Sequence, residues 1–405
     1  MFTPKNLEAF VCQASSALEL KLIAKEEDFF DDAAIFRPEM THQVFGEREN
    51  IFGYKNLKIK LYYSHDDLYT YAAMEYDAKI DPRTHQKLKP DDVVKALSAV
   101  VPPGFTRSRD EFLARISDPK RCFTPYGEHI GSYPQEGNKN VTFEIYKANI
   151  HTPGFLQYHA RLQTFIIWYI DASSFIDVED EKWTFYLLFS REVVNGVSSY
   201  TSMGYSTVYS FYAFPDKSRY RISQMLILPP FQRKGHGARL LQAIYDDLVP
   251  SPSVRDILVE DPSDDFQVMR DYVDCRNILA SEGVRSPTAT GDLFGQEVMQ
   301  VCQKLKLSKK QARRVCEILQ LRVTDRGNPD QYTKYRLWVK SRLNEPYQRQ
   351  KKDLEKLQPY LSPVEVATMK LHSEEEQRAQ LHETYKLLEE DYLKVIEKLA
   401  VTSGI

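Results

Sequence analysis

The segment that most constrains the fold is QMLILPPFQRKGHGARLL, residues 224–241. An apolar run ends at two prolines, and Gly235 and Gly237 follow just before apolar residues that recur with helical spacing. These apolar positions are Ala238, Leu241, Ile244, Tyr245 and Leu248. Because the apolar segment VRDILVE (254–260) comes next, we predict a strand, a glycine-rich turn, a helix and a second strand over residues 221–260.

The glycine-rich turn can be interpreted in two ways. The first N–H groups of a helix have no intrahelical partner and lie at the positive end of its dipole. Glycine lets a ligand approach these groups, so the turn fits a pyrophosphate-binding site to which Arg233 and Lys234 add positive charge. An ordinary tight turn whose glycines serve helix packing is the alternative. Neither the three glycines of a dinucleotide-binding turn nor the Gly-Lys-Ser/Thr of a P-loop is present.

Composition narrows the classes of protein to which the chain can belong. Its 405 residues allow two or three domains, and a hydrophobic fraction of 42% is that of a folded protein. The formal net charge of −3 gives no global signature of polyanion binding. The sequence shows neither the pattern of a signal peptide nor an apolar run long enough to span a bilayer, so we expect a soluble intracellular protein.

The cysteines are scattered along the chain and form no Cys-x-x-Cys pair. This pattern argues against a disulfide framework or a zinc site and suits a reducing compartment, so no metal is expected. The five cysteines are Cys12, Cys122, Cys275, Cys302 and Cys316.

The first block of the chain, residues 1–150, mixes strand-like and polar segments. Alternating apolar residues with β-branched and aromatic enrichment predict strands at 57–64 and 141–148. Between them, residues 125–140 are predicted to form a long polar connection. We expect this block to be an α+β domain.

The second block, residues 151–270, contains the glycine-rich turn. Apolar residues at helical spacing predict a helix within 154–176. Strand-like segments follow at 183–190, 200–214 and 221–228.

The remainder is predicted to be helical, with a domain over 271–345 and a tail over 346–405. Residues 304–356 hold 16 Lys or Arg against six Asp or Glu, a local net charge of +10. Such faces are mostly solvated, so direct nucleic-acid binding is not expected, and docking of a histone or a chaperone is only as plausible as nucleic-acid binding. The tail carries an apolar stripe that suits docking of a helix, formed by Leu381, Tyr385, Leu388, Tyr392, Val395 and Leu399.

These motifs resemble a known family. The pattern Gln/Arg-x-x-Gly-x-Gly/Ala after an apolar strand resembles motif A of the GNAT acetyltransferases. More closely, RLQTF, SFIDVEDEKW, SQMLILPPFQRKGHGA, VEDPSDDF and PEMTHQVFGE…FGYKNLKI are similar, in order from about residue 35 to 345, to the catalytic subunits of type B histone acetyltransferases. The resemblance implies a central GNAT mixed sheet with flanking helices, between the N-terminal α+β domain and the C-terminal helical region.

The resemblance also implies that acetyl-CoA is the co-substrate. The main chain of the strand at 225–227 would bind its pantetheine arm, and the amides of the turn would bind its pyrophosphate. Two further residues would contact the far part of the coenzyme. The implied coenzyme-binding residues are Met225, Leu226, Ile227, Gln232, Arg233, Lys234, Gly235, His236, Gly237, Ala238, Ser263 and Phe266. The His236 side chain itself is predicted to be a spacer in the turn.

Acetyl transfer to an amine requires a group that removes the amine's proton. Lysine has an ordinary pKa near ~10.4, so most of its amine is charged at neutral pH and a carboxylate in a cleft can serve as general base. The resemblance assigns this role to Glu260, with Asp261 and Asp171 as assisting or alternative bases. A helix-capping or solvated Glu260 is the other interpretation. No cysteine lies within the matched motifs, which favours direct attack over an acetyl-cysteine intermediate.

A basic peptide substrate calls for acidic and aromatic surfaces. Residues 171–182 contain five acids and one lysine, and residues 260–265 contain four acids, although such clusters are often only solvated. By resemblance the substrate is the tail of histone H4, with H3 alongside it, and its contacts map to Glu47, Arg48, Glu49, Trp183, Tyr209, Ser210 and Phe211. Trp183 and Tyr209 fit a hydrophobic core equally well.

We therefore predict a histone acetyltransferase that modifies tail lysines of free, newly made H4 during histone deposition. The resemblance implies a WD-repeat histone-binding subunit as partner and residence in both nucleus and cytoplasm. A GNAT enzyme acting on another basic peptide or a polyamine is the alternative within enzymes. A non-catalytic acetyl-CoA-binding scaffold for histone chaperones is the alternative outside them.

Overall fold

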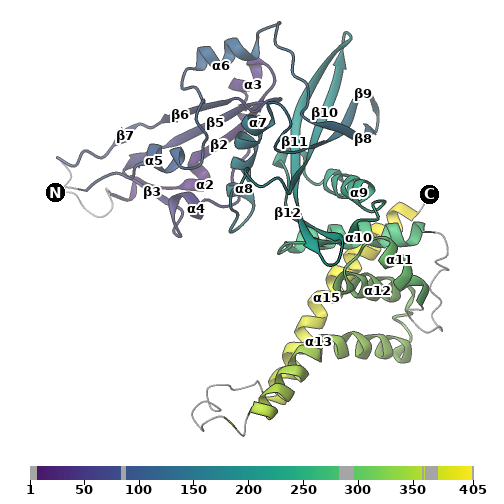
Figure 1. Cartoon of the computed structure of the whole chain (residues 1–405). Helices are drawn as coiled ribbons and strands as arrows, with labels where there is room; N and C mark the ends of the chain where they lie inside the picture. Colours follow the sequence, from purple (N-terminus) through teal and green to yellow (C-terminus); the bar gives the residue numbers. More distant parts are fainter. Residues whose placement is uncertain (1–6, 84–87, 282–295, 358–359, 361–372, 404–405) are drawn as a thin grey trace. The chain divides into compact units, whose positions relative to one another are not determined.

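The computed structural model describes residues 7–83, 88–281, 296–357, 360 and 373–403 (Figure 1). The chain separates into two compact units, residues 1–248 and 249–405. The division into four parts at residues 150, 270 and 345 stays a prediction. Among the described helices, none is both long and apolar enough to cross a bilayer.

The N-terminal part of the first unit is built on a three-stranded sheet. Its strands are β2 (Leu18–Ile23), β5 (Lys58–Ser64) and β6 (Thr70–Glu75), in the order β2-β5-β6, with β2 parallel to β5 and β5 antiparallel to β6. Two short antiparallel ladders join β1 (Val11–Gln13) to β3 (Asn50–Phe52) and β4 (Tyr54–Lys55) to β7 (Ala78–Lys79). The helices of this part are α2 (Ala14–Ala17), α3 (Glu26–Phe30), η1 (Asp32–Ala34), α4 (His42–Phe45), α5 (Val93–Ser98) and α6 (Arg109–Ile116).

A second, larger antiparallel sheet follows in the same unit. Its strands are β8 (Glu128–Gln135), β9 (Asn138–Ala148), β10 (Trp183–Val194), β11 (Val197–Ala213) and β12 (Lys217–Ile227), which neighbour one another in the order β12-β11-β10-β9-β8. The helices are α7 (Phe155–Leu162), η2 (Gln163–Phe165), α8 (Ile166–Tyr169), η3 (Pro229–Phe231) and α9 (His236–Leu248). The predicted succession of strand, glycine-rich turn and helix is confirmed in β12, the turn and α9.

The prediction of a polar connection over 125–140 is wrong for most of its length, because residues 128–135 form β8. This strand pairs antiparallel with β9 and has register shifts beside Gly131 and Pro134. It is mostly solvent-exposed and contains a glycine and a proline, so the period-2 apolar signal of a half-buried strand is absent. The tight link to β9 places Gly137 at φ +78°, a left-handed conformation that glycine adopts without cost.

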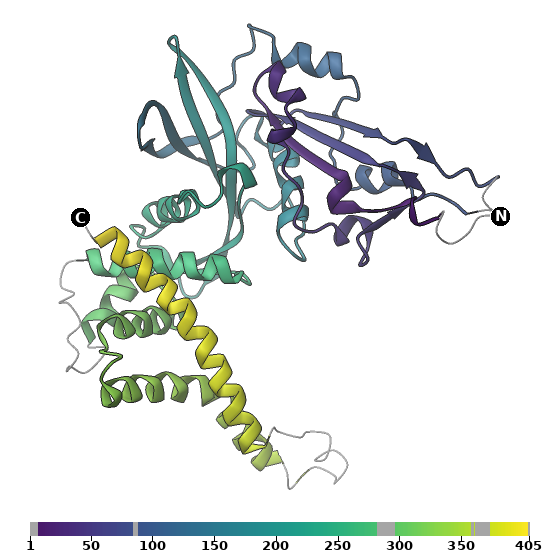
Figure 2. The ribbon, with the colours of Figure 1, turned by 180° about the vertical axis from the view of Figure 1, so that it is seen from behind.

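The larger of two described hydrophobic clusters in the first unit runs through both of its sheets. It contains Tyr63 from the N-terminal sheet, Phe165 and Trp168 from the helical segment between the sheets, and Phe185 and Leu187 from β10. Figure 2 shows α7 and α8 between the two groups of strands, as in Figure 1. The core therefore includes residues on both sides of residue 150.

The second unit is mainly helical. It begins with β13 (Val254–Val259) and continues with α10 (Asp264–Ala280), α11 (Gln296–Lys304), α12 (Lys309–Val323), α13 (Pro329–Leu357) and α15 (Glu374–Ser403). The apolar stripe predicted in the tail docks as expected, because α15 contacts α10, α12 and α13. The buried residues of the stripe are Tyr385, Tyr392, Val395 and Leu399.

Two arginines of the basic segment 304–356 form ion pairs with buried carboxylates of this helical unit. The buried carboxylate of Asp271 pairs with Arg314 at 2.5 Å. Glu317, 1% exposed, accepts hydrogen bonds from Arg342 at 2.7 Å and from the Tyr392 hydroxyl at 2.7 Å. Buried charges are tolerated only when they are paired and hydrogen-bonded in this way. The first unit is rich in β-strands and the second unit is mainly helical, so the predicted mixed fold class is confirmed.

Candidate active site

The strand predicted to bind the pantetheine arm is β12, and an irregularity in its pairing precedes the predicted residues. The register with β11 shifts between Thr207 and Val208, where Thr207 faces Gln224 but Val208 faces Ile222. Such a bulge bends a strand and increases its local twist. The structure places Met225 and Ile227 half-buried in this strand, with Leu226 buried between them.

Gly204 on β11 lets the two strands approach at this position. It faces Ile227 and adopts φ +157°. A β-carbon there would lie 2.3 Å from the carbonyl oxygen of Leu226, so only glycine fits without a shift of the backbone. The position of the predicted coenzyme strand thus depends on a glycine that the sequence analysis did not single out.

The turn after β12 is held by its own side chains. The Gln232 amide donates to the Ile227 carbonyl at 2.8 Å, and Lys234 donates to the Pro230 carbonyl at 2.9 Å. Arg233 and Gly235 both adopt left-handed φ values, +60° and +83°. Apart from chain neighbours, no described heavy atom lies within 4 Å of where a β-carbon of Gly235 would stand. The backbone is therefore open to a ligand just before α9.

The first residues of α9 confirm the predicted start of the helix and show a role that the sequence did not reveal. Gly237 and Ala238 are half-buried in the first turn, and His236 is buried. The His236 Nδ1 atom hydrogen-bonds the Tyr133 hydroxyl at 2.8 Å, and its ring packs edge-on against Phe143 at 4.5 Å. Burial lowers the pKa of His236, and the charge of Lys234 lowers it further.

His236 is therefore an anchor of the helix start on β8 and β9, and the prediction of a spacer is wrong. No local sequence pattern indicates the hydrogen bond, because Tyr133 lies about 100 residues away on a strand that was not predicted. The other end of α9 is fixed as well. Asp247 pairs with Lys147 at 2.7 Å and accepts a hydrogen bond from the Tyr186 hydroxyl at 2.6 Å.

The predicted substrate aromatics form one cluster. Trp183 on β10 faces Tyr209 on β11, which in turn faces Arg221 on β12. The ring centroids of Trp183 and Tyr209 are 4.8 Å apart, and those of Tyr209 and Phe211 are 4.5 Å apart. The Arg221 guanidinium lies 4.6 Å from the Phe211 ring centre. The three rings are half-buried, and so is Ser210, whose N–H donates to the Lys182 carbonyl at 3.2 Å.

The acidic segment 171–182 is attached to this cluster. The Tyr209 hydroxyl donates to Asp180 at 2.7 Å. This hydrogen bond raises the pKa of Tyr209, whereas the Lys182 backbone N–H and then Tyr209 lower the pKa of Asp180. At its start, the segment is tied to β12 because the Gln224 amide donates to the Ser174 carbonyl at 2.8 Å. Gln224, buried and adjacent to Met225, was also missed from the sequence.

The predicted acids near the N-terminus lie by α4. Glu49 accepts hydrogen bonds from the backbone N–H groups of Thr41 at 2.9 Å and His42 at 3.1 Å, and the Thr41 bond in particular lowers the pKa of Glu49. His42 Nε2 lies 3.1 Å from Asp171, so the structure brings Asp171 beside Glu49. Glu47 and Arg48 are exposed. This group thus combines exposed charges with one carboxylate that fixes the local backbone.

The predicted base belongs to the second unit. Glu260 directly follows β13 and is half-buried, and Asp261 next to it is exposed with φ +33°. Ser263 caps α10, since its hydroxyl accepts the Phe266 N–H at 3.3 Å. The carbonyl of Ile257 on β13 accepts a hydrogen bond from the buried Arg270 at 3.0 Å. Glu260 therefore stands at the junction of a fixed strand and a capped helix.

Cys275 lies on α10 in the same unit. Its surroundings help to decide between direct attack by the amine and an acetyl-cysteine intermediate. The side chain is fully buried within the helical core. Burial raises the pKa of the Cys275 thiol well above its ordinary value. A nucleophilic cysteine needs a thiolate, so this residue is not suited to an acetyl-cysteine intermediate.

Comparison with known proteins gives consistent matches along the chain. The family model "Histone acetyl transferase HAT1 N-terminus" matches residues 10–171, and "Histone acetyltransferase type B catalytic subunit, C-terminal" matches residues 270–321. The chain is 41% identical over 404 residues to the human histone acetyltransferase type B catalytic subunit, covering 98% of this chain and 95% of that protein. It is 31% identical to the protein of the same description from Cryptococcus neoformans, covering 97% and 98%.

Among solved structures, an aminoglycoside acetyltransferase from an uncultured soil metagenomic sample matches with a TM-score of 0.25 and 15% identity. The match covers 35% of this chain and 92% of that chain.

Proposed function

The chain belongs to the family of type B histone acetyltransferase catalytic subunits, and from this premise we propose that it acetylates tail lysines of free, newly made histone H4. It is thus an acetyl-CoA-dependent acyltransferase. The proposal adds the substrate, the residues and the route: direct attack of the lysine amine with Glu260 as general base. We also propose H3 and a WD-repeat histone-binding subunit as partners, and residence in both nucleus and cytoplasm.

The observation that carries the proposal is the open backbone at the start of α9. The space around a β-carbon position of Gly235 holds no described heavy atom apart from chain neighbours, and the helix itself is anchored at both ends. A helix N-terminus of this kind favours phosphate groups. We propose that the amides from Gln232 to Ala238 bind the pyrophosphate and that β12 binds the pantetheine arm. Bound in this way, acetyl-CoA supplies an acetyl thioester that an amine can attack.

Residues of the chain would then remove a proton from the lysine amine. A lysine with an ordinary pKa near ~10.4 must lose a proton before its nitrogen can attack. Glu260 is half-buried after β13, where a carboxylate is partly shielded from water and can accept that proton. Asp261 and Asp171 are the alternative bases, and Ser263 and Phe266 are proposed to contact the coenzyme.

The substrate surface follows from charge and shape. The aromatic cluster of Trp183, Tyr209 and Phe211 offers apolar contact and cation–π attraction to a lysine side chain. The acidic segment 171–182 and the Glu47–Glu49 group would attract the positive charges of the peptide. Because a basic tail is complementary to this combination, we propose that these two regions of the first unit bind the H4 tail.

The proposal is tested by comparing substrates with the intact protein. Acetyl transfer from acetyl-CoA should be measured on an H4-tail peptide, on nucleosomes and on spermidine, with mass spectrometry of the products. We expect the free tail to be acetylated, nucleosomes to be poor substrates and spermidine to be left unmodified. Preferred acetylation of spermidine would replace the proposal by a polyamine acetyltransferase. Coenzyme binding without transfer to any substrate would favour a scaffold.

A further inference from the structure

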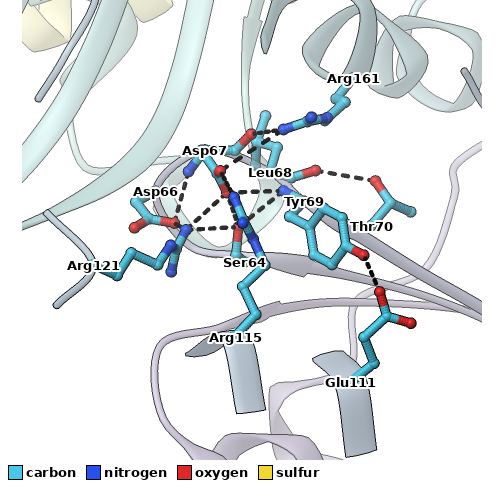
Figure 3. A network of polar contacts seen from close by, with 10 residues as sticks. All are labelled: Ser64, Asp66, Asp67, Leu68, Tyr69, Thr70, Glu111, Arg115, Arg121 and Arg161. Carbon is cyan, nitrogen blue, oxygen red and sulfur yellow. Dashed lines mark hydrogen bonds and ion pairs between the residues drawn. The ribbon is translucent and has the colours of Figure 1, made fainter. Parts of the chain in front are cut away.

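The turn between β5 and β6 carries a network of buried polar contacts, shown in Figure 3. We call residues 64–69 the hub turn. Asp66 and Asp67 are only 5% and 9% exposed, and Leu68 is fully buried with φ +57°. A residue with a side chain rarely adopts this left-handed conformation and keeps it only where its surroundings enforce it. The contacts of the hub turn must therefore hold it in place.

The carboxylate of Asp67 is the centre of these contacts. It accepts hydrogen bonds from Arg115 at 2.5 Å, from Arg121 at 2.8 Å and from the Tyr69 N–H at 3.1 Å. The Ser64 hydroxyl donates to it as well. Burial alone would raise the pKa of Asp67, but the Ser64 hydrogen bond and the two arginine charges outweigh burial and lower the pKa to about 2. The carboxylate is therefore charged throughout the physiological range.

The arginines come from separate elements, and one of them leads toward the proposed substrate surface. Arg115 lies on α6, and Arg121 follows that helix. Arg161 lies on α7; it donates to the Asp67 carbonyl at 3.0 Å and forms an ion pair with the Asp67 carboxylate at 3.8 Å. From α7 the chain continues through η2 and α8 directly into the acidic segment 171–182. The hub turn thus contacts the helix from which the chain leads into this segment.

The same turn is joined to the large sheet. The Ser202 N–H on β11 donates to the His65 carbonyl at 2.6 Å, and the His65 Nδ1 atom lies 3.0 Å from the Thr201 hydroxyl. The next residue, Met203, accepts the N–H of Leu228 at 2.8 Å. Leu228 directly follows β12, so a short path of backbone contacts connects the hub turn to the proposed coenzyme strand.

We propose that Asp67 is a positioning residue for acetyl transfer: it fixes the α7–α8 segment, and with it the substrate surface, relative to the coenzyme strand. Small displacements of bound reactants lower rates strongly, since a shift of about 1 Å can cost 10²-fold. The inference rests on the proposed locations of the peptide and the coenzyme. A residue that only stabilised the fold would instead affect every substrate equally.

The test compares two substrates in the intact protein. Asp67→Asn keeps the size of the side chain but removes the charge that the arginines surround. Steady-state kinetics should be measured with the full H4 tail and with a short peptide around one unmodified target lysine, together with the Kd for coenzyme. The full tail can extend from the aromatic cluster along the acidic segment toward Asp171, whereas the short peptide covers only the part around its lysine. We expect the KM for the full tail to rise about tenfold, which is less than the 10²-fold cost of a displacement of about 1 Å. The kcat/KM for the short peptide and the Kd for the coenzyme should stay near their wild-type values.

A matched control separates positioning from stability. Glu317→Gln removes another buried carboxylate that pairs with an arginine, but in the second unit. It should lower the melting temperature without changing the ratio of the two kcat/KM values. If Asp67→Asn also leaves this ratio unchanged, the proposal is wrong.

A milder variant covers the case in which Asp67→Asn does not fold. Arg161→Gln removes only the link to α7 and leaves Arg115 and Arg121 on Asp67. It should raise the KM for the full tail in the same direction, and an unchanged KM would overturn the inference. The proposed function fails separately, if wild-type protein does not acetylate the H4 tail at all.

Discussion

At the scale of single residues, His159 on α7 links the stability of the fold to pH. It is completely buried among Phe155, Phe185 and Tyr205, and neither ring nitrogen has a hydrogen-bond partner in the described structure. Burial lowers the pKa of His159 to about 4, below its ordinary value of 6.5. The folded protein therefore holds the neutral ring, whereas the unfolded chain binds a proton below pH 6.5.

This linkage predicts a pH-dependent stability. The contribution of His159 is fully present above pH 6.5 and is lost as the pH falls toward 4, by about 1.4 kcal/mol per pH unit. His159→Leu should raise the free energy of unfolding by about 1–3 kcal/mol, since no polar atom is then buried without a partner. It should also make the decline below pH 6.5 shallower; half-buried His65 and buried His236, whose pKa values are lowered too, keep part of the slope.

Denaturant unfolding between pH 4.5 and 7.5 checks this prediction. His151→Leu is the matched control, because the His151 side chain is 67% exposed and should leave the slope as it is. An equally steep slope in His159→Leu would show that other groups cause the pH dependence.

At the scale of elements, the turn before α9 combines a left-handed backbone conformation with a proposed coenzyme-binding site, and mutations can separate the effects of the two. Gly235 and Gly137 both have left-handed φ values, +83° and +78°, and neither has a described neighbour within 4 Å of a β-carbon position. Alanine at either site should cost about 1–2 kcal/mol, because side chains disfavour this conformation. Only Gly235 lies at the proposed pyrophosphate site.

Gly235→Ala should therefore weaken coenzyme binding about tenfold or more, since a β-carbon stands where the ligand meets the backbone. Gly137→Ala, in the β8–β9 link, should lower stability by a similar amount without this loss. Titration calorimetry with coenzyme A, together with thermal melts, measures both effects. Equal coenzyme affinities for the two variants would remove the turn from the binding site.

Local sequence signals predicted the elements whose apolar residues follow a clear period, and they failed where that period was absent. The apolar runs at 183–190 and 221–228 became β10 and β12, and the helical spacing after Gly237 became α9. β8 was missed because its exposed edge needs no apolar alternation. With β8 missed, the anchoring of His236 on Tyr133 could not be foreseen.

At the scale of the whole molecule, the resemblance to the family predicted the fold class and the enzyme class, both now shown. The hub turn escaped prediction for a physical reason. Its partners at positions 115, 121, 161 and 202 are far apart in sequence, and each is an unremarkable polar residue on its own. Only folding brings them together around one turn.

We propose that Glu260 is the general base of histone acetylation in this chain. The most direct test is the kcat of Glu260→Gln for an H4-tail peptide, measured beside the coenzyme Kd and the exposed control Glu375→Gln. We predict a loss of about 10²-fold to 10⁴-fold in kcat for Glu260→Gln, the usual contribution of a general base, with coenzyme affinity and the control unchanged. A kcat equal to that of the wild-type protein would contradict the account.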